Sequence, residues 1–213
     1  MQFDKIKNKG QGQIFHNEHL EELTKTHPIV IYSLYLPVIA GMLYYGVSYK
    51  NIGALAVAGL FVAGALAWSL VEYVLHRWVF HMIADSERLK RIAYTIHGVH
   101  HEYPRDQERL FMPPVPSLVV ALILFSLFYA MMGWYVLAFF PGFLFGYLMY
   151  GSMHFAIHAF APPKYLKALW RNHHLHHYKH PDKGFGVSSV LWDHIFGTIP
   201  AKDKPETSSA GSL

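Results

Sequence analysis

Residues 172–177 read Asn-His-His-Leu-His-His, and the interpretation of the whole chain starts from this stretch. Within it, His173, His176 and His177 have the spacing i, i+3, i+4. On a helix, such residues lie within an arc of about 100°, so we expect the three imidazoles to converge on one point. His174 sits at the rim of that arc and is expected to lie outside the ligand set.

The same spacing recurs once in the chain, two further pairs of histidines complete the set, and the sequence contains no cysteine. Neutral imidazole is the commonest metal ligand in proteins. Ten of the sixteen histidines fall in four spaced clusters, which favours a metal centre over a set of separate core or surface histidines. The three further clusters are His76 with His81, then His97 with His100 and His101, then His154 with His158.

Ten imidazoles are too many for one ion but suit two ions, each with about five nitrogen ligands and one open position at octahedral geometry. A structural zinc site would be closed and four-coordinate, so the surplus predicts a reactive dinuclear site. His76 and His81 are five residues apart, about 140° around a straight helix. Either the helix ends between them, or the two residues serve different metals.

Two residues lie one turn before predicted ligands. Glu72 is the one acidic residue inside an apolar span, and an intramembrane carboxylate indicates a functional role. We expect it to accept a hydrogen bond from the His76 imidazole. Tyr150 precedes His154 in the same way, although an ordinary interfacial tyrosine is an equal alternative. For Asp193, a loop role and a role beside the ligands both stay open.

The composition indicates a membrane protein. Apolar residues make up 53% of the chain and charged residues 15%, which is unusual for a soluble domain. The absence of cysteine excludes disulfides, thiolate zinc fingers and iron–sulfur clusters. Four apolar runs are each long enough to cross a bilayer core of about 30 Å, and a soluble buried bundle is the alternative. The runs cover about 29–47, 52–75, 115–132 and 134–152.

The basic residues predict the orientation of these runs. Lys50 is the one basic residue in the first connection, and the turn between the last two runs has none, so 17 of the 18 Lys and Arg residues lie on one face. The positive-inside rule makes that face cytosolic. The net charge of +4 is therefore a topology signal and not a nucleic-acid footprint. All four histidine clusters fall on the same cytosolic face, as do both termini.

Beyond the histidines, several short stretches carry a family resemblance over about residues 70–200. They are His-Arg-Trp-Val-Phe-His at 76–81, His-Gly-Val-His-His at 97–101, Pro-Pro-Val-Pro at 113–116, Gly-Phe-Gly-Val-Ser-Ser at 184–189 and Leu-Trp-Asp at 191–193. With the histidine spacing, they resemble the fatty acid hydroxylase superfamily of membrane di-iron oxygenases, which includes sterol desaturases and carotenoid hydroxylases. The similarity is greatest to its fatty acid 2-hydroxylase branch.

This resemblance implies an all-α membrane protein, with four transmembrane helices and a cytosolic helical cap that holds the dimetal site. It implies one integral-membrane hydroxylase domain over 1–200, followed by a polar tail at 201–213 that we expect to be disordered. The metal roles of the family carry over to the ten clustered histidines. The cofactors would be two iron ions, with zinc in their place in isolated protein, and dioxygen.

The implied reaction is 2-hydroxylation of a long fatty acyl group, either of a ceramide or other sphingolipid or of a free fatty acid. Fungal and animal 2-hydroxylases carry an N-terminal cytochrome b5 domain, which residues 1–28 cannot hold. We therefore expect electrons from a separate carrier, such as cytochrome b5 or ferredoxin with NAD(P)H. The lipid would enter from the bilayer, with its head near 111–116 and 184–189, although plain connecting loops are the alternative there.

Other functions stay open at this point. A sterol or lipid desaturase, or a carotenoid hydroxylase, would use the same metal site on another lipid. A metal transporter is a different class, and it would place several ionisable residues at mid-membrane, where this chain has only Glu72.

Overall fold

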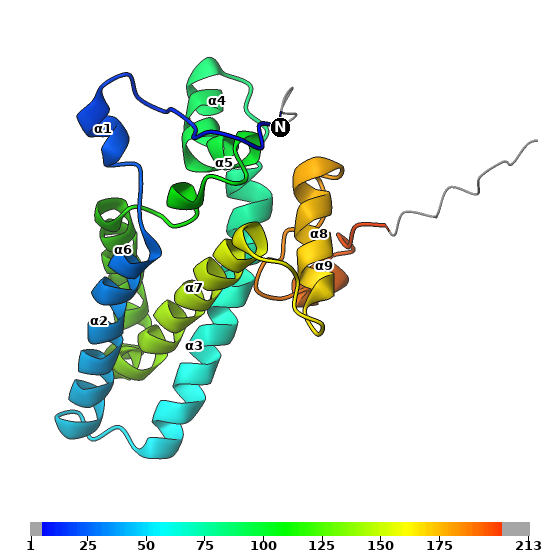
Figure 1. Ribbon diagram of the computed structural model, residues 1–213. Helices are drawn as coiled ribbons and strands as arrows, with labels where there is room; N and C mark the ends of the chain where they lie inside the picture. The colour runs from blue at the N-terminus through cyan, green and yellow to red at the C-terminus, as the bar shows by residue number, and fades with distance from the viewer. Residues whose placement is uncertain (1–5, 202–213) are drawn as a thin grey trace, which may run out of the picture.

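The computed structural model describes residues 6–201, and within that range the secondary structure is helical, with no strand. Residues 202–213 of the predicted tail lie outside the described residues. Four long helices form an elongated stalk (Figure 1). They are α2 (Pro28–Ser48), α3 (Ala54–Val74), α6 (Pro114–Met132) and α7 (Val136–Ala159).

Three segments are long and apolar enough to cross a membrane: Pro28–Ser48, Ala54–Phe80 and Gln107–Ala159. The third contains both α6 and α7, which are separated by the short turn η4 (Gly133–Tyr135). The outer faces of the stalk are apolar yet exposed; Leu122 and Met131 on α6, for example, are 63% and 71% exposed. An apolar surface of this extent is what a helix facing lipid presents.

Helix α7 forms the centre of the stalk and packs against α2 and α3. Two glycines allow α3 and α7 to touch along their backbones. A Cβ at Gly142 would lie 1.9 Å from the Phe61 carbonyl oxygen, and one at Gly64 would lie 2.0 Å from the Phe139 carbonyl oxygen. These glycines therefore let α3 and α7 approach closely, as small residues do between membrane helices.

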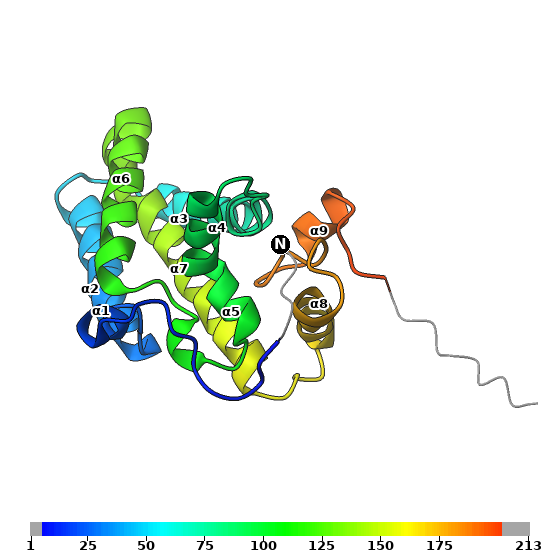
Figure 2. The same ribbon diagram turned by 90° about the horizontal axis from the view of Figure 1, so that it is seen from above.

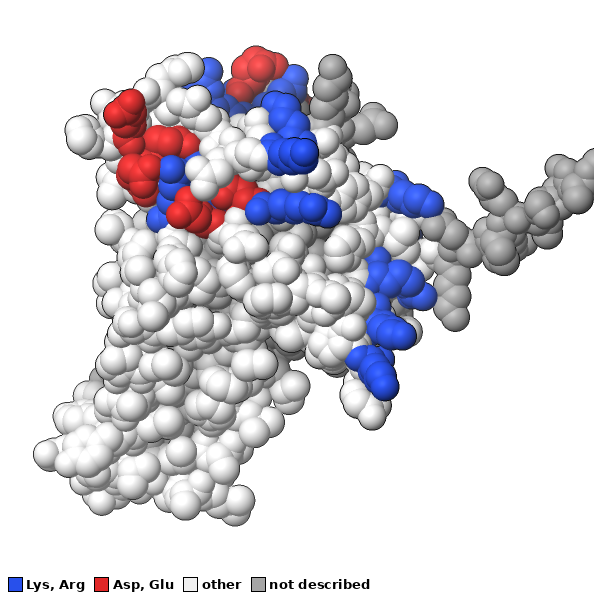
Figure 3. Space-filling view, in the orientation of Figure 1, with Lys and Arg blue, Asp and Glu red and all other residues white. Residues whose placement is uncertain are grey.

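The two short turns lie together at the end of the stalk opposite the one where most of the charged residues gather. Lys50, in the turn between α2 and α3, stacks its Nζ 3.6 Å from the centroid of the Trp134 ring in η4. Figure 3 shows the acidic and basic side chains gathered at the other end and along α8, whereas the stalk below them is free of charge in that view. The molecule thus has one apolar and one charged end.

The charged end is a cap built from short helices, and Figure 2 looks down on it. Helix α8 carries the stretch 172–177 and stands beside the upper parts of α3 and α7. The cap elements are α1 (Glu18–Glu22), α4 (Glu87–Ala93), α5 (Val99–Glu102), η3 (Gln107–Arg109), α8 (Lys167–Tyr178) and α9 (Leu191–Ile195).

Candidate metal centre

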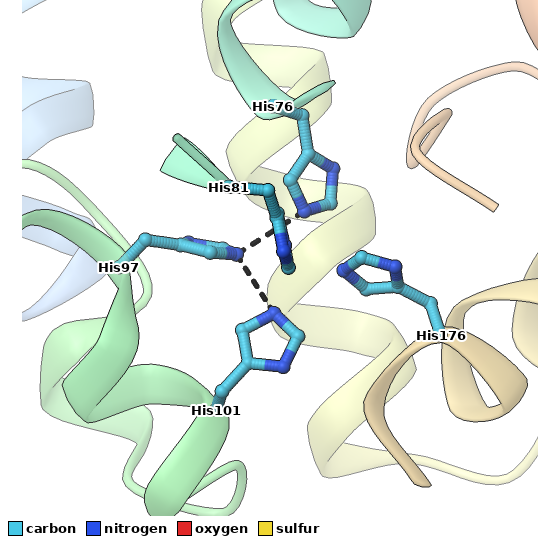
Figure 4. Close-up of side chains that lie close together, drawn as sticks. All are labelled: His76, His81, His97, His101 and His176. Atoms are coloured by element: carbon cyan, nitrogen blue, oxygen red, sulfur yellow. Dashed lines mark hydrogen bonds between the residues drawn. The ribbon is translucent and has the colours of Figure 1, made fainter. Parts of the chain in front are cut away.

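All ten clustered histidines meet where the stalk joins the cap, in two groups of five. In each group, one ring nitrogen from every residue lies within 4.8 Å of those of the other four. Figure 4 shows the rings of the first histidine group pointing toward a common centre. The first group is His76, His81, His97, His101 and His176; the second group is His100, His154, His158, His173 and His177.

A change of helix type explains how His76 and His81 join the same group. The last turn of the α3 rod becomes a π-helix, η1 (Leu75–Phe80), and the His81 amide donates to the His76 carbonyl, 3.2 Å away. In a π-helix, hydrogen bonds run from i+5 to i, so five residues bring the side chain back to the same face. Of the two alternatives, the first applies, because the helix ends at Phe80, between the two histidines, after its last turn has become a π-helix. The second does not apply, because His76 and His81 lie in the same group.

The two histidine triplets do not each converge on one point, so that expectation was wrong. Residues four apart share a group, as His173 and His177 do, whereas His176 points into the other group. The 97–101 triplet divides in the same way after the π-helix η2 (Tyr94–Gly98), with His100 as the separate member. Each triplet therefore bridges the two groups, and the stacked rings of His101 and His177, 4.2 Å apart, lie between them.

The ring nitrogens of the first group are arranged to bind a cation rather than to hydrogen-bond with one another. His97 Nε2 lies 3.1 Å from His76 Nε2 and 3.0 Å from His101 Nε2. The His76 Nδ1–H donates to the Phe185 carbonyl at 2.6 Å, which leaves Nε2 of this ring with a lone pair. His176 is fixed in the same way.

For His176, Nδ1 lies 2.8 Å from the Lys183 carbonyl oxygen, and Nε2 is buried without a hydrogen-bond partner. The Nε2 of His81 is also buried without a hydrogen-bond partner. Ring nitrogens that converge in this way could hold a cation, and an all-nitrogen set suits iron or zinc.

The second group repeats this convergence on α5, α7 and α8. His100 Nε2 lies 2.9 Å from His154 Nε2 and 3.1 Å from His177 Nε2. His173 Nε2 lies 2.9 Å from His158 Nε2 and 3.0 Å from His177 Nε2. His154 and His158 extend the end of α7, as the sequence predicts. His174 lies outside both groups and bonds through Nδ1 to the Trp170 carbonyl.

Burial keeps these imidazoles in the form that binds metals. His97, His173 and His177 are almost completely buried. Burial lowers the pKa of all three well below 6.5, and neighbouring histidines lower it further. A neutral imidazole offers a lone pair to a cation, so the apolar surroundings prepare the ligands.

Glu72 does not accept a hydrogen bond from His76 as predicted, because its carboxylate faces the loop at 184–189 instead. Its Oε1 accepts the Val187 and Ser188 amides, each at 2.8 Å, and its Oε2 accepts the Ser188 hydroxyl. Glu72 thus holds the loop whose Phe185 carbonyl orients His76. Its effect on the ligand passes through the backbone of that loop.

Asp193 holds the same loop as Glu72. Its Oδ1 accepts the Phe185 amide at 3.0 Å, and its Oδ2 accepts the Gly186 amide at 2.8 Å. Of the two roles that the sequence leaves open for it, these contacts favour the loop role. Gly184 adopts φ = +70°, a conformation that favours glycine and turns the loop toward the histidines. Sequence reasoning missed the carbonyls of Lys183 and Phe185, and the Gly-Phe-Gly stretch was the signal for them.

A cavity of about 460 Å³ opens directly onto the histidines. His97 of the first group, and His100 and His154 of the second, form part of its wall. Phe111, Met112, Pro113 and Pro116 of the 111–116 segment line it, whereas the 184–189 loop does not. Tyr150 also lines the cavity, and its ring stacks on His154 with centroids 5.7 Å apart. Trp68, Leu75 and Phe80, from α3 and η1, also line it. Much of the remaining wall is apolar and comes from α6 and α7: Val120, Ala121, Leu124, Phe140, Phe143 and Leu144.

Together, the fold and the site define an all-helical protein with membrane-length helices and a buried ten-histidine centre beside an apolar cavity. Comparison with known proteins gives the family. A family model for fatty acid hydroxylases matches residues 61–198. The chain belongs to the fatty acid hydroxylase family, and the resemblance seen in the sequence is confirmed.

The relatives share most of this chain. It is 38% identical over 201 residues to the ceramide very long chain fatty acid hydroxylase SCS7 of Saccharomyces cerevisiae, covering 92% of this chain and 52% of that protein. It is 36% identical over 191 residues to the dihydroceramide fatty acyl 2-hydroxylase FAH2 of Arabidopsis thaliana, covering 88% and 80%. The chain thus spans about half the length of the yeast relative.

A solved structure described as full-length scs7p, with only the hydroxylase domain visible, superposes with a TM-score of 0.85 at 36% identity. The match covers 92% of this chain and 75% of that one. The helical stalk and cap are therefore the architecture of that hydroxylase domain.

Proposed function

We propose that this chain 2-hydroxylates a long fatty acyl group of a membrane lipid, with one metal ion in each histidine group. The observation that carries the proposal is the cavity, because its apolar wall and ligands of both groups face the same space. Relatives at 33–40% identity are named as fatty acid or ceramide hydroxylases. The acyl group of a ceramide or other sphingolipid, or a free fatty acid, is the substrate class that fits.

Two iron ions would supply, with dioxygen, the redox chemistry needed to oxidise an unactivated C–H bond, which zinc cannot provide. The chain's own residues hold and aim the ligands: the carbonyls of Phe185 and Lys183 fix the tautomers of His76 and His176. Glu72 fixes the loop that carries these carbonyls. Tyr150 limits the rotation of His154 by stacking on it.

The cavity would position the substrate and exclude water. An acyl tail fits among the apolar side chains of α6 and α7, and C2 lies one carbon from the carbonyl, next to the polar end of the lipid. A site at the junction of stalk and cap reaches C2 while the tail stays among apolar side chains. A mid-chain position would instead require the tail to be drawn up into the cap.

We also infer four membrane spans, formed by α2, α3, α6 and α7, with both termini and the metal site in the cytosol. The contact between Lys50 and Trp134 supports this, because it brings the α2–α3 turn and the α6–α7 turn to one end of the stalk. Those turns carry one basic residue between them, and the positive-inside rule assigns such an end to the outer side. Reporter fusions at both termini should read cytosolic.

Hydroxylation by dioxygen places one oxygen atom in the product and reduces the other to water, which consumes two electrons and two protons. We propose that an electron carrier such as cytochrome b5 or ferredoxin, reduced by NAD(P)H, supplies the electrons.

Expression in a host without this activity, followed by lipid mass spectrometry, tests the proposed function. We expect acyl lipids that gain one oxygen atom, located at C2 by fragmentation. A new double bond or a hydroxylated ring would instead identify another activity of the same metal site. An unchanged lipid profile, with iron and a reductant supplied, would refute the hydroxylase proposal.

A further inference from the structure

The N-terminal segment, residues 6–27, forms a wall of the cavity although it contributes no histidine to either group. Ile14, Leu23 and Thr24 line the same cavity as His97 and His100. Figure 1 shows this segment crossing the cap from α5 to the upper end of α2. Residues far from the ligands in sequence therefore border the space in front of them.

Arg109 clamps the segment in place. Its guanidinium is buried, with 2% of the side chain exposed. It donates to the Gly12 carbonyl at 2.7 Å, to the Thr24 hydroxyl and to the Glu21 carboxylate, and its Nε bonds Asp106 at 3.0 Å. Three of these four bonds go to the N-terminal segment, so its position against the cavity is fixed by charge as well as by packing.

The segment also packs directly on α5, the helix that carries His100 and His101. A Cβ at Gly12 would lie 2.3 Å from Val99 Cγ2, and Val99 lies between His97 and His100 in the sequence. Nearer the N-terminus, the Lys7 amide donates to the Glu102 carbonyl at 2.7 Å, and the Lys7 ammonium bonds the Glu102 carboxylate at 2.7 Å. The wall and the ligands therefore form one packed unit.

The direction of the cavity assigns a role to this wall. In the stalk it is lined mainly by apolar side chains of α3, α6 and α7, whereas Ile14, Leu23, Thr24 and Arg109 line it from the cap. With C2 at the histidines and the tail along α6 and α7, the head group must lie toward the N-terminal segment. We propose that Ile14, with Leu23 at the rim, determines which lipid head groups are accepted. This inference rests on the proposed 2-hydroxylase function.

Two substitutions of opposite size at one position test the proposal. Full-length protein is assayed on one acyl chain presented as a free fatty acid, as a ceramide and as a hexosylceramide. Ile14→Ala should raise kcat/KM for the largest head group relative to the smallest, and Ile14→Trp should lower it. We expect shifts of about tenfold, since small changes in a pocket typically alter discrimination by roughly 10–200-fold. Phe15→Ala and Phe15→Trp, on the exposed neighbour outside the cavity wall, should leave the ratio unchanged.

A second matched pair guards against a variant that does not fold. Leu23→Ala should widen the rim and favour the larger head groups, whereas Leu20→Ala, on the exposed helix α1 just before it and outside the cavity wall, should not. Metal content is measured for every variant.

Ratios that stay unchanged in the Ile14 and Leu23 variants, with full metal content, would overturn the inference alone. An equal loss on all three lipids would also overturn it, because it would show a structural role. Wild-type protein that gives no 2-hydroxy product from any of them would overturn the proposed function, and the inference with it.

Discussion

At the scale of single residues, the centre depends on groups that orient ligands without touching a metal. His76 and His176 are oriented by carbonyls of one loop, and Glu72 and Asp193 grip the amides of that loop. The sequence indicates that Glu72 matters, because a carboxylate in an apolar span requires partners. It does not indicate which partners, because the loop lies more than a hundred residues away in the chain.

Glu72→Ala should lower metal occupancy or activity by roughly 10–100-fold, the usual effect of losing a group that orients metal ligands. The change removes the acceptor of two amides and one hydroxyl, so the loop and its Phe185 carbonyl are released. Metal content after dialysis against a chelator gives the measurement. Glu87→Ala, on the exposed surface of α4, is the control. Full occupancy and activity in Glu72→Ala would show that the loop needs no such anchor.

At the scale of helices, two local departures from ideal geometry create the site. The π-helix η1 turns His81 toward the group of His76, and a Gly-mediated backbone contact joins α3 to α7. The periodicity of the sequence predicts the long helices and their histidines well, since apolar length and spacing are local properties. It cannot predict a π-helix or the division of the triplets, because both depend on how α5, α7 and α8 pack around shared centres.

Gly142→Ala should destabilise the protein by about 1–3 kcal/mol, the usual cost of overpacking. The new methyl group would meet the Phe61 carbonyl, which belongs to rigid helix backbone. Gly59→Ala is the matched control, since a Cβ there meets nothing within 4 Å and the change gains up to about 1 kcal/mol of helix propensity. Thermal unfolding in detergent compares the two variants. A Gly142→Ala protein as stable as Gly59→Ala would show that α3 and α7 are not in backbone contact.

At the scale of the whole molecule, an apolar stalk and a charged cap enclose ten imidazoles at their junction, eight of them buried and two, His81 and His158, partly buried. Because so many histidines are buried in the neutral form, the folded metal-free protein is less stable at low pH. The sequence predicts the family, the one-sided histidine clusters and the all-helical fold, because each leaves a pattern of residue types. The cavity and the N-terminal wall in front of it leave no such pattern, since Ile14 and Arg109 come to line the same cavity only after folding.

Metal-free protein should lose stability as the pH falls below about 6.5. Burial holds the pKa of His97, His173 and His177 well below 6.5 when folded, whereas the unfolded chain protonates near that value. In that window, the unfolded state binds more protons, so the free energy of unfolding decreases with decreasing pH. The unfolding midpoint of chelator-treated protein should therefore be constant between pH 8 and pH 7 and fall toward pH 5.5. A flat profile to pH 5.5 would contradict the burial of neutral imidazoles.

The most direct test of the account is anomalous X-ray diffraction from crystals of protein loaded with iron, with data collected on both sides of the iron edge. We expect two peaks per chain, one among the first group of five histidines and one among the second group. A single peak, or none near the 172–177 stretch, would contradict the dinuclear centre on which the proposed function depends.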